Sequence, residues 1–249
     1  YNLDPKLLSI LGRLHFRTSY GQNVLDHSIE VAFLMNVIAG EMGLDPLLAR
    51  RAGLMHDLGK AAMPMDVLNK PGKLTDGEFA IVKSHPEVGA KILIESYQVS
   101  PMVLDVCLHH HEKTDGSGYP KGLKGDEISL FAKMGAVCDV YDAITSNRPY
   151  KIGWDPAESL RKMAEWANGH FDPTVFQAFV KSLGIYPIGS LVRLESGRLG
   201  VVVEQTGASL GAPAPVPGGR NVPVPGPALP SGAPAPAPDV DTTAREGSD

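Results

Sequence analysis

The chain has 249 residues, of which 43% are hydrophobic and 20% are charged, so it can form one domain with a sizeable core. Its formal net charge of −5 and its lack of long runs of like charge exclude the broad basic patch of a general nucleic-acid-binding protein. Two cysteines, Cys107 and Cys138, are too few for a disulfide framework, and no apolar stretch approaches the roughly 18 residues of a membrane span, so we expect a cytoplasmic protein.

Helical periodicity dominates most of the chain. Apolar residues recur with helical spacing from Val24 and predict a long, largely buried helix that ends near Gly43, and Pro46 fits the first turn of the next helix. Thr75 followed by Glu78 predicts a capping box at the start of a third helix. Further helices are expected at 86–95, 100–112, 129–146, 156–166 and 173–183.

The last part of the chain departs from this pattern. Residues 190–195 and 198–205 alternate like strands, and Ser196-Gly197 fits a tight turn between them. Proline, glycine and alanine then dominate, which favours a disordered tail that is dispensable for folding. The expected fold class is therefore all-α, a helical bundle with a small C-terminal β-hairpin. The expected parts are the bundle at 1–185, the hairpin at 186–206 and the Pro/Ala/Gly-rich tail at 207–249.

Histidines and aspartates are spread over the predicted helices in a way that suits a metal site. Imidazole and carboxylate groups are the ligands that zinc, manganese and iron accept in proteins. One helix can direct only a few side chains at one point, so a multi-metal site in a bundle needs ligands from several helices. The candidate ligands are His27, His56, Asp57, His85, His110, His111 and Asp139.

Each of these residues has a simpler interpretation when it is taken alone. His27 on an apolar helix fits a buried core histidine, and the three histidines at 109–111 fit a polar helix end in solvent. The pair His56-Asp57 fits a helix end that is capped by Gly59. Only their joint occurrence, in this order along the chain, favours the metal site over the separate interpretations.

A series of motifs strengthens the metal hypothesis. The motifs are His56-Asp57-Leu58-Gly59-Lys60, Lys70-Pro71-Gly72-Lys73, His85-Pro86, His110-His111-Glu112, Gly118-Tyr119-Pro120, Asp139-Val140-Tyr141-Asp142 and Arg148-Pro149-Tyr150. In this order and spacing they resemble the HD-GYP family of phosphohydrolases, from about residue 54 to about residue 205. The preceding residues, 17–54, resemble more closely the HD domain of ribonuclease Y.

The HD-GYP resemblance implies an HD-domain bundle that binds two divalent metal ions. All of the candidate ligands would bind them, with Asp57 bridging the pair and His27 at one end. Some relatives bind a third metal through a glutamate four residues before the first histidine, and this position is Asn23 here. Iron or manganese is favoured as the metal, and zinc, cobalt and nickel are compatible with the same ligands.

The same resemblance implies a phosphodiesterase that hydrolyses cyclic di-GMP to pGpG and then to GMP. Asp57 and Lys60 would be the catalytic residues, with Lys60 neutralising charge on the leaving oxygen or protonating it. Two metal ions would polarise the phosphate and activate water. The residues that would bind the substrate are Arg148, Lys151, Gly118, Tyr119 and Pro120.

Several alternatives stay open at this point. A ribonuclease Y-like or general nucleotide phosphodiesterase is favoured by residues 17–54 alone, and the missing basic stripe argues against long RNA as a partner. A catalytically silent signalling or interaction module would keep the fold, but it would have less need of a full ligand set. Packing within the turn explains Tyr119 as well as substrate contact does. A homodimer is compatible with the sequence, and a sensor or receiver domain is expected before Tyr1.

Overall fold

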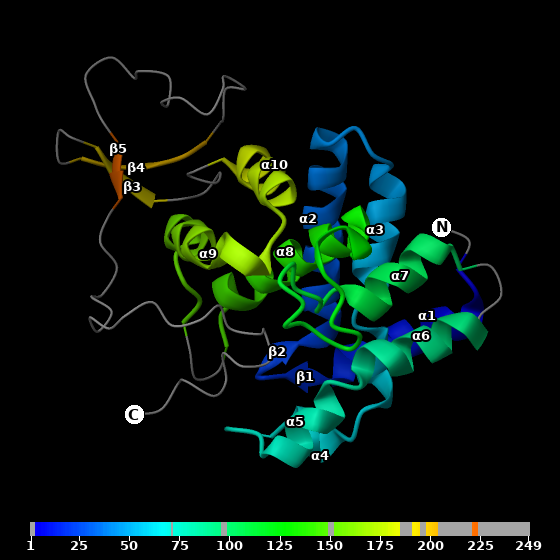
Figure 1. Cartoon of the computed structure of the whole chain (residues 1–249). Helices are drawn as coiled ribbons and strands as arrows, with labels where there is room; N and C mark the ends of the chain where they lie inside the picture. Colours follow the sequence, from blue (N-terminus) through cyan, green and yellow to red (C-terminus); the bar gives the residue numbers. More distant parts are fainter. Residues whose placement is uncertain are drawn as a thin grey trace.

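Helices make up most of the structure (Figure 1). The computed structural model describes residues 3–70, 72–95, 99–148, 152–184, 191–194, 198–203 and 221–223. Within these ranges no helix is both long enough and apolar enough to cross a membrane. Lys151 and nearly all of the Pro/Ala/Gly-rich tail lie outside the described residues, so the expectations for them stay predictions.

The N-terminal part of the bundle contains two long packed helices, as predicted. Its elements are α1 (Pro5–Arg13), η1 (Leu14–Phe16), β1 (Thr18–Ser19), β2 (Gln22–Asn23), α2 (Val24–Glu41) and α3 (Pro46–Met55). The Asn23 side chain caps α2 by accepting hydrogen bonds from two backbone N–H groups, and Asp45 caps α3 ahead of Pro46. The sequence pattern does not predict α1 or the two-residue strands β1 and β2, which are too short for a periodic signal.

The middle of the chain runs through short helices into the centre of the bundle. Its elements are η2 (Leu58–Ala62), α4 (Met65–Leu68), α5 (Asp76–Val82), α6 (His85–Glu95), α7 (Pro101–His109), η3 (Gly125–Glu127) and α8 (Leu130–Thr145). The predicted capping box is present at α5, where Thr75 and Glu78 exchange side-chain and backbone hydrogen bonds. Ser100 caps α7 and Ser129 caps α8, which confirms the predicted starts of both helices.

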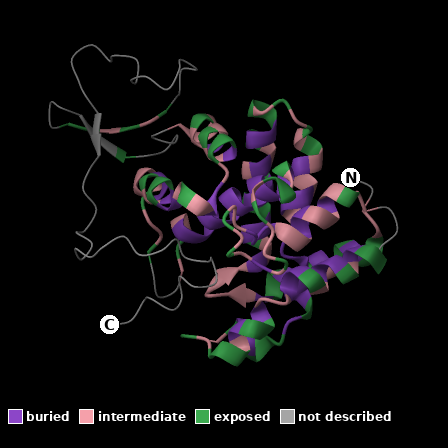
Figure 2. Ribbon diagram, in the orientation of Figure 1, coloured by how far each residue is buried: buried purple, intermediate pink, exposed green. Residues whose placement is uncertain are grey.

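Helix α8 is the central element of the core. Every residue from Phe131 to Ile144 is buried, and Figure 2 shows the buried residues concentrated where α8 meets its neighbours. Helices α2, α3 and α7 pack against it, as do α9 (Pro156–His170) and α10 (Pro173–Leu183). Because α8 is covered on all sides, its polar residues Asp139 and Asp142 need partners inside the protein.

The predicted antiparallel pairing of the C-terminal strands is confirmed, and an additional strand lies beside it. The predicted turn at Ser196-Gly197 lies outside the described residues. β3 (Leu191–Leu194) pairs antiparallel with β4 (Leu199–Val201), with Leu191 opposite Val201. β5 (Asn221–Pro223) pairs antiparallel with the other edge of β3. The sequence predicts no regular structure for the segment that contains β5, because its composition lacks any strand periodicity. The open edge of β3 supplies the unpaired backbone groups that such a strand can bind.

A close approach of α2 and α3 at Gly53 gives the first testable prediction. Gly53→Ala should lower the free energy of unfolding by about 1–3 kcal/mol, because the added methyl group would lie 2.8 Å from the Ala32 Cα atom. Gly40→Ala is the matched control in α2, where nothing lies within 4 Å of the added carbon, and it should change stability by less than about 1 kcal/mol. Urea denaturation of both variants measures the difference. Equal stabilities would contradict this packing of α2 on α3.

Candidate metal centre

The candidate ligands come together in one buried cluster. His27 lies one turn inside α2, and Asp139 lies near the middle of α8. The others lie at helix ends, with His56 capping α3, Asp57 before η2, His85 beginning α6, and His110 and His111 following α7. All of these side chains are buried, so the cluster lies inside the bundle and not on its surface.

Asp57 lies at the centre of the cluster, and its two oxygens face different histidines. Oδ1 is 3.2 Å from His85 Nε2 and 3.9 Å from His110 Nε2. Oδ2 is 3.6 Å from His56 Nε2 and 3.7 Å from His27 Nε2. The Asp57 carboxylate therefore lies between two adjacent groups of imidazole nitrogens, which is the position that a bridging ligand requires.

Asp139 and His111 complete the cluster from the opposite side. Asp139 Oδ1 is 2.9 Å from His27 Nε2, and Asp139 Oδ2 is 3.8 Å from His111 Nδ1. His111 Nε2 is 3.2 Å from His85 Nε2. Three overlapping groups have ligand atoms within 4.8 Å of one another, namely Asp57-His85-His110-His111, His27-His56-Asp57 and His56-His110-Asp139.

Backbone carbonyl groups orient several of the imidazole rings. In each of these rings Nδ1 donates to a carbonyl oxygen, so the proton lies on Nδ1 and the lone pair of Nε2 points into the cluster. The donor–acceptor distances are 2.7 Å from His56 to Gly53 O, 2.8 Å from His85 to Val82 O, and 3.0 Å from His110 to Val106 O. These acceptors are carbonyl groups near helix ends, which explains why the ligands lie there.

The residues present fit a divalent cation centre. Asp57 is 1% exposed, and neither of its oxygens has a well-directed hydrogen bond within the described residues. Lys60 Nζ lies 2.9 Å from Oδ2 and supplies one positive charge nearby. Converging imidazole lone pairs and a buried carboxylate with one lysine charge nearby are unfavourable unless a cation lies between them. The set of nitrogen and carboxylate donors matches borderline metals such as zinc, manganese and iron.

His27 carries a carboxylate on each of its ring nitrogens. Nδ1 lies 2.6 Å from Asp142 Oδ2, and Nε2 contacts Asp139. Burial alone would lower the pKa of His27, but these two carboxylates outweigh it and raise the pKa to about 10. Asp142 is therefore the partner that orients His27, and without a metal His27 holds a proton that a cation must displace.

Four other candidate ligands, His56, Asp57, His110 and His111, have shifted pKa values that favour their metal-binding protonation states. Burial lowers the pKa of His56, and burial with the neighbouring imidazoles lowers the pKa of His110 to about 3. Burial also lowers the pKa of His111 well below its usual value. Although burial alone would raise the pKa of Asp57, Lys60 and the nearby histidines hold it well below the usual range. Neutral imidazoles and an ionised carboxylate are the forms that bind metals.

Two glycines allow η2 and α6 to approach closely beside the cluster. A Cβ atom on Gly59 would lie 1.9 Å from the carbonyl oxygen of His85, and one on Gly89 would lie 2.7 Å from Cys107 Sγ. Gly59 has no positive φ, so the helix-cap interpretation of this glycine is wrong. Its function is to let the backbone that carries Asp57 pack against the start of α6, which places His85 beside that carboxylate.

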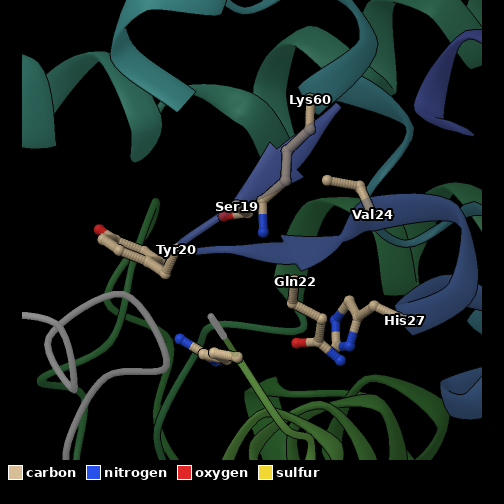
Figure 3. Close-up of a pocket in the computed structure, with 7 residues that line it drawn as sticks. Ser19, Tyr20, Gln22, Val24, His27 and Lys60 are labelled. Carbon is tan, nitrogen blue, oxygen red and sulfur yellow. The ribbon is translucent and has the colours of Figure 1, made fainter. Parts of the chain in front are cut away.

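A pocket opens next to the cluster (Figure 3). The empty space between its lining residues, open solvent included, is about 270 Å³. The lining residues are Ser19, Tyr20, Gln22, Val24, His27, Lys60 and Arg148. The predicted catalytic Lys60 and phosphate-binding Arg148 thus share one pocket with the candidate ligand His27. Arg148 donates one hydrogen bond to the carbonyl oxygen of Ala143 at 2.9 Å, which holds the guanidinium near the end of α8.

The Gly118-Tyr119-Pro120 loop packs directly on the cluster. The Tyr119 ring is buried and stacks on His111, with ring centroids 4.6 Å apart. A Cβ atom on Gly118 would lie 2.5 Å from the Glu112 Cα atom, so this position requires glycine. The geometry gives Tyr119 a packing function against a ligand, and substrate contact by this loop stays a prediction.

Sequence reasoning missed three residues that support the site. Asp142 orients His27, and it is three residues after Asp139 on the same face of α8, which was an available signal. Gln22 Nε2 donates to Asp142 Oδ2 at 2.6 Å and had no signal, because its hairpin was not predicted. Buried Glu112 accepts from the N–H groups of Lys121 and Leu123 and so holds the loop.

His109 and His170, which are not candidate ligands, have other contacts. His109 Nδ1 pairs with Asp105 at 2.8 Å, and the Asp105 carboxylate also accepts from Ser129. The carbonyl oxygen of His170 accepts from the N–H group of Thr114 at 3.2 Å. Both residues lie outside the cluster of candidate ligands.

An all-helical core with a buried cluster of histidines and aspartates defines a class of metal-dependent hydrolase domains. The family model for the HD domain matches residues 16–175. The chain belongs to this family, and the predicted resemblance to HD-GYP proteins is confirmed. The resemblance of residues 17–54 to ribonuclease Y stays a prediction.

Three similar proteins illustrate the range of relatives. The chain is 64% identical over 212 residues to the cyclic di-GMP phosphodiesterase PA4108 of Pseudomonas aeruginosa, covering 84% of this chain and 50% of that protein. It is 37% identical over 166 residues to the 3′3′-cGAMP-specific phosphodiesterase 3 of Vibrio cholerae, covering 65% of this chain and 35% of that protein. Bd1817, an HDG"Y"P protein from Bdellovibrio bacteriovorus, has a similar fold, with a TM-score of 0.52, 23% identity, and coverage of 62% of this chain and 50% of that chain. The chain thus spans half or less of the length of these relatives.

The raised pKa of His27 predicts proton release on metal binding. With a pKa of about 10, metal-free His27 is protonated at pH 8, so binding of Mn²⁺ should release about one proton. The affinity for Mn²⁺ should therefore rise from pH 7 towards pH 10. Titration calorimetry in two buffers with different ionisation enthalpies measures the proton count. Asp142→Asn removes one carboxylate from His27 and should reduce the release at pH 8. Zero release by the parent chain would contradict the assignment of His27.

Proposed function

We propose that the chain is a metal-dependent phosphodiesterase that hydrolyses cyclic di-GMP. One observation carries the proposal, namely that the two oxygens of buried Asp57 face different groups of histidines beside a pocket lined by Lys60 and Arg148. A centre of this kind suits an anionic phosphodiester, because the cations and the two basic side chains would neutralise its charge. The Pseudomonas aeruginosa and Vibrio cholerae relatives are named as phosphodiesterases of cyclic dinucleotides, which supports the same substrate class here.

The proposed centre binds two divalent cations, with iron or manganese favoured. His27, His56, Asp139 and Asp57 would hold one end, and Asp57, His85, His110 and His111 would hold the other. Asn23 supports two metal ions instead of three. It stands where some relatives have a glutamate that binds a third metal, and its side-chain oxygen is occupied in capping α2. When bound, the cations would supply Lewis acidity and lower the pKa of water. The remaining steps depend on the side chains around them.

Lys60 is proposed to act on the leaving group. In the hydrolysis, a water oxygen forms a bond to phosphorus, the bond from phosphorus to the 3′ oxygen breaks, and the 3′ oxygen takes up a proton. Lys60 lines the pocket while its Nζ atom contacts Asp57, so a phosphate near the cluster would lie within its reach. It would stabilise the negative charge on the 3′ oxygen or donate the proton to it. Hydrolysis of both diesters would give pGpG and then GMP.

Arg148 and Lys151 are proposed to bind the phosphates beside the reacting bond. The hydrogen bond from Arg148 to Ala143 O fixes the position of its planar guanidinium, which suits two-point binding of phosphate oxygens. Lys151 follows three positions later, outside the described residues. The loop of Gly118, Tyr119 and Pro120 would form the wall beside His111. Contacts of this kind, made outside the reacting phosphate, would distinguish the proposed substrate from a simple diester.

A turnover assay tests the function. Manganese-loaded protein should convert cyclic di-GMP faster than single-stranded RNA of equal phosphate concentration, because the chain has a net charge of −5 and no extended basic stripe. 3′3′-cGAMP is the second candidate, favoured by the Vibrio cholerae relative. Faster cleavage of RNA would overturn the substrate class, and no turnover of any diester would favour a silent binding module.

Lys60→Ala should lower turnover by about 10²–10⁴-fold while the metal content stays close to that of the parent chain. The expected reason is that Nζ stabilises the leaving oxygen but is not a metal ligand. Lys181→Ala is the matched control, since Lys181 is exposed and pairs with Glu41 away from the pocket. Parallel measurements of rate and bound manganese separate the effects. A loss of metal equal to the loss of rate would show that Lys60 supports the ligands instead.

A further inference from the structure

The β1–β2 hairpin holds a fixed position at the edge of the pocket. Thr18 donates from its N–H group and from Oγ1 to Asn69 Oδ1, at 3.1 and 2.8 Å. On the other strand, Gln22 Nε2 donates to Asp142 Oδ2 and to Ser146 Oγ, at 2.6 and 2.9 Å. Each strand is therefore hydrogen-bonded to a different part of the bundle, and these bonds fix the position of the turn between the strands.

The turn of this hairpin contains an unfavourable residue. Tyr20 and Gly21 connect the strands with φ angles of 49° and 83°, the pattern of a type I′ turn. Within the described part of the chain, Tyr20 is the one residue other than glycine with a positive φ. Asparagine followed by glycine is the favoured sequence for such a turn, and a bulky residue is strained there. A strained residue held by a well-anchored frame points to a function beyond the turn itself.

The position of Tyr20 indicates what that function is. Tyr20 and His27 lie at opposite sides of the pocket, with Lys60 and Ser19 between them (Figure 3). The half-buried Tyr20 ring thus forms a wall of the pocket across from a metal ligand. A cyclic dinucleotide has flat bases on either side of its phosphates. With one phosphate at the cluster, a base would extend towards this wall.

We propose that the Tyr20 ring stacks on a nucleobase of the substrate and so acts as a specificity residue. The proposal rests on the proposed function, and it names the contact that selects a nucleotide diester over a diester without bases. Stacking on an aromatic ring contributes to binding of every base, because each base has a π-face. Tyr20 would therefore favour nucleotides as a class and would not distinguish guanine from adenine.

The test compares variants that separate the ring from the turn. Tyr20→Asn creates Asn-Gly, so the hairpin should be at least as stable and the melting temperature should not fall. The KM for cyclic di-GMP should nevertheless rise about 10-fold, because the stacking surface is lost. Tyr20→Phe keeps the ring and should keep the KM within about twofold. The inhibition constant of inorganic phosphate, which has no base, should stay unchanged in both variants.

The outcomes distinguish this proposal from the proposed function. An inactive parent chain would overturn both proposals, whereas an active parent with equal KM values in Tyr20→Asn and Tyr20→Phe would overturn the stacking alone. If Tyr20→Asn weakened the binding of cyclic di-GMP and of inorganic phosphate equally, Tyr20 would support the structure of the centre, which also overturns stacking. A rise in KM of similar size for cyclic di-GMP and 3′3′-cGAMP, with phosphate unaffected, would support it. If Tyr20→Asn fails to fold, Tyr20→Leu provides the same comparison with Tyr20→Phe.

Discussion

Asp57 is a buried carboxylate among imidazole rings, and the rest of the site is arranged around its charge. Its oxygens face two groups of histidines, and neither oxygen has a well-directed hydrogen bond within the described residues. An ion of this kind is costly to bury without compensating positive charge. Lys60 supplies one such charge, and divalent cations between the carboxylate and the imidazoles would supply the rest. Burial lowers the pKa values of His56, His110 and His111, whereas the two carboxylates that contact His27 raise its pKa.

The fold brings these groups together by using helix ends. A histidine at a helix end can donate Nδ1 to a carbonyl near that end, which fixes the ring and directs Nε2 inward. Gly59 and Gly89 then allow η2 and α6 to approach until Asp57 and His85 meet. From the other side, Gln22 connects the β1–β2 hairpin to Asp142 and so to His27. These contacts connect the hairpin that lines the pocket to the cluster of candidate ligands.

Much of the bundle could be predicted because its signals are local. The caps Ser100, Ser129 and Thr75 mark helix starts, and the hydrophobic spacing from Val24 defines α2. The candidate ligands could be selected because the motif series gives their identity and order, and the structure brings them together in one cluster. The β1–β2 hairpin could not be predicted, since its strands have two residues each and its turn contains tyrosine where asparagine is usual. Gln22 acts through contacts distant in sequence, which no local pattern encodes.

Metal analysis of the parent chain and of Asp57→Ala tests the central claim most directly. If Asp57 serves both groups of histidines, protein purified with manganese should contain about two ions per chain, and Asp57→Ala should retain fewer than one. Circular dichroism of both proteins controls for folding. Equal metal content in a folded Asp57→Ala variant, or a parent chain that binds no metal at all, would contradict the account.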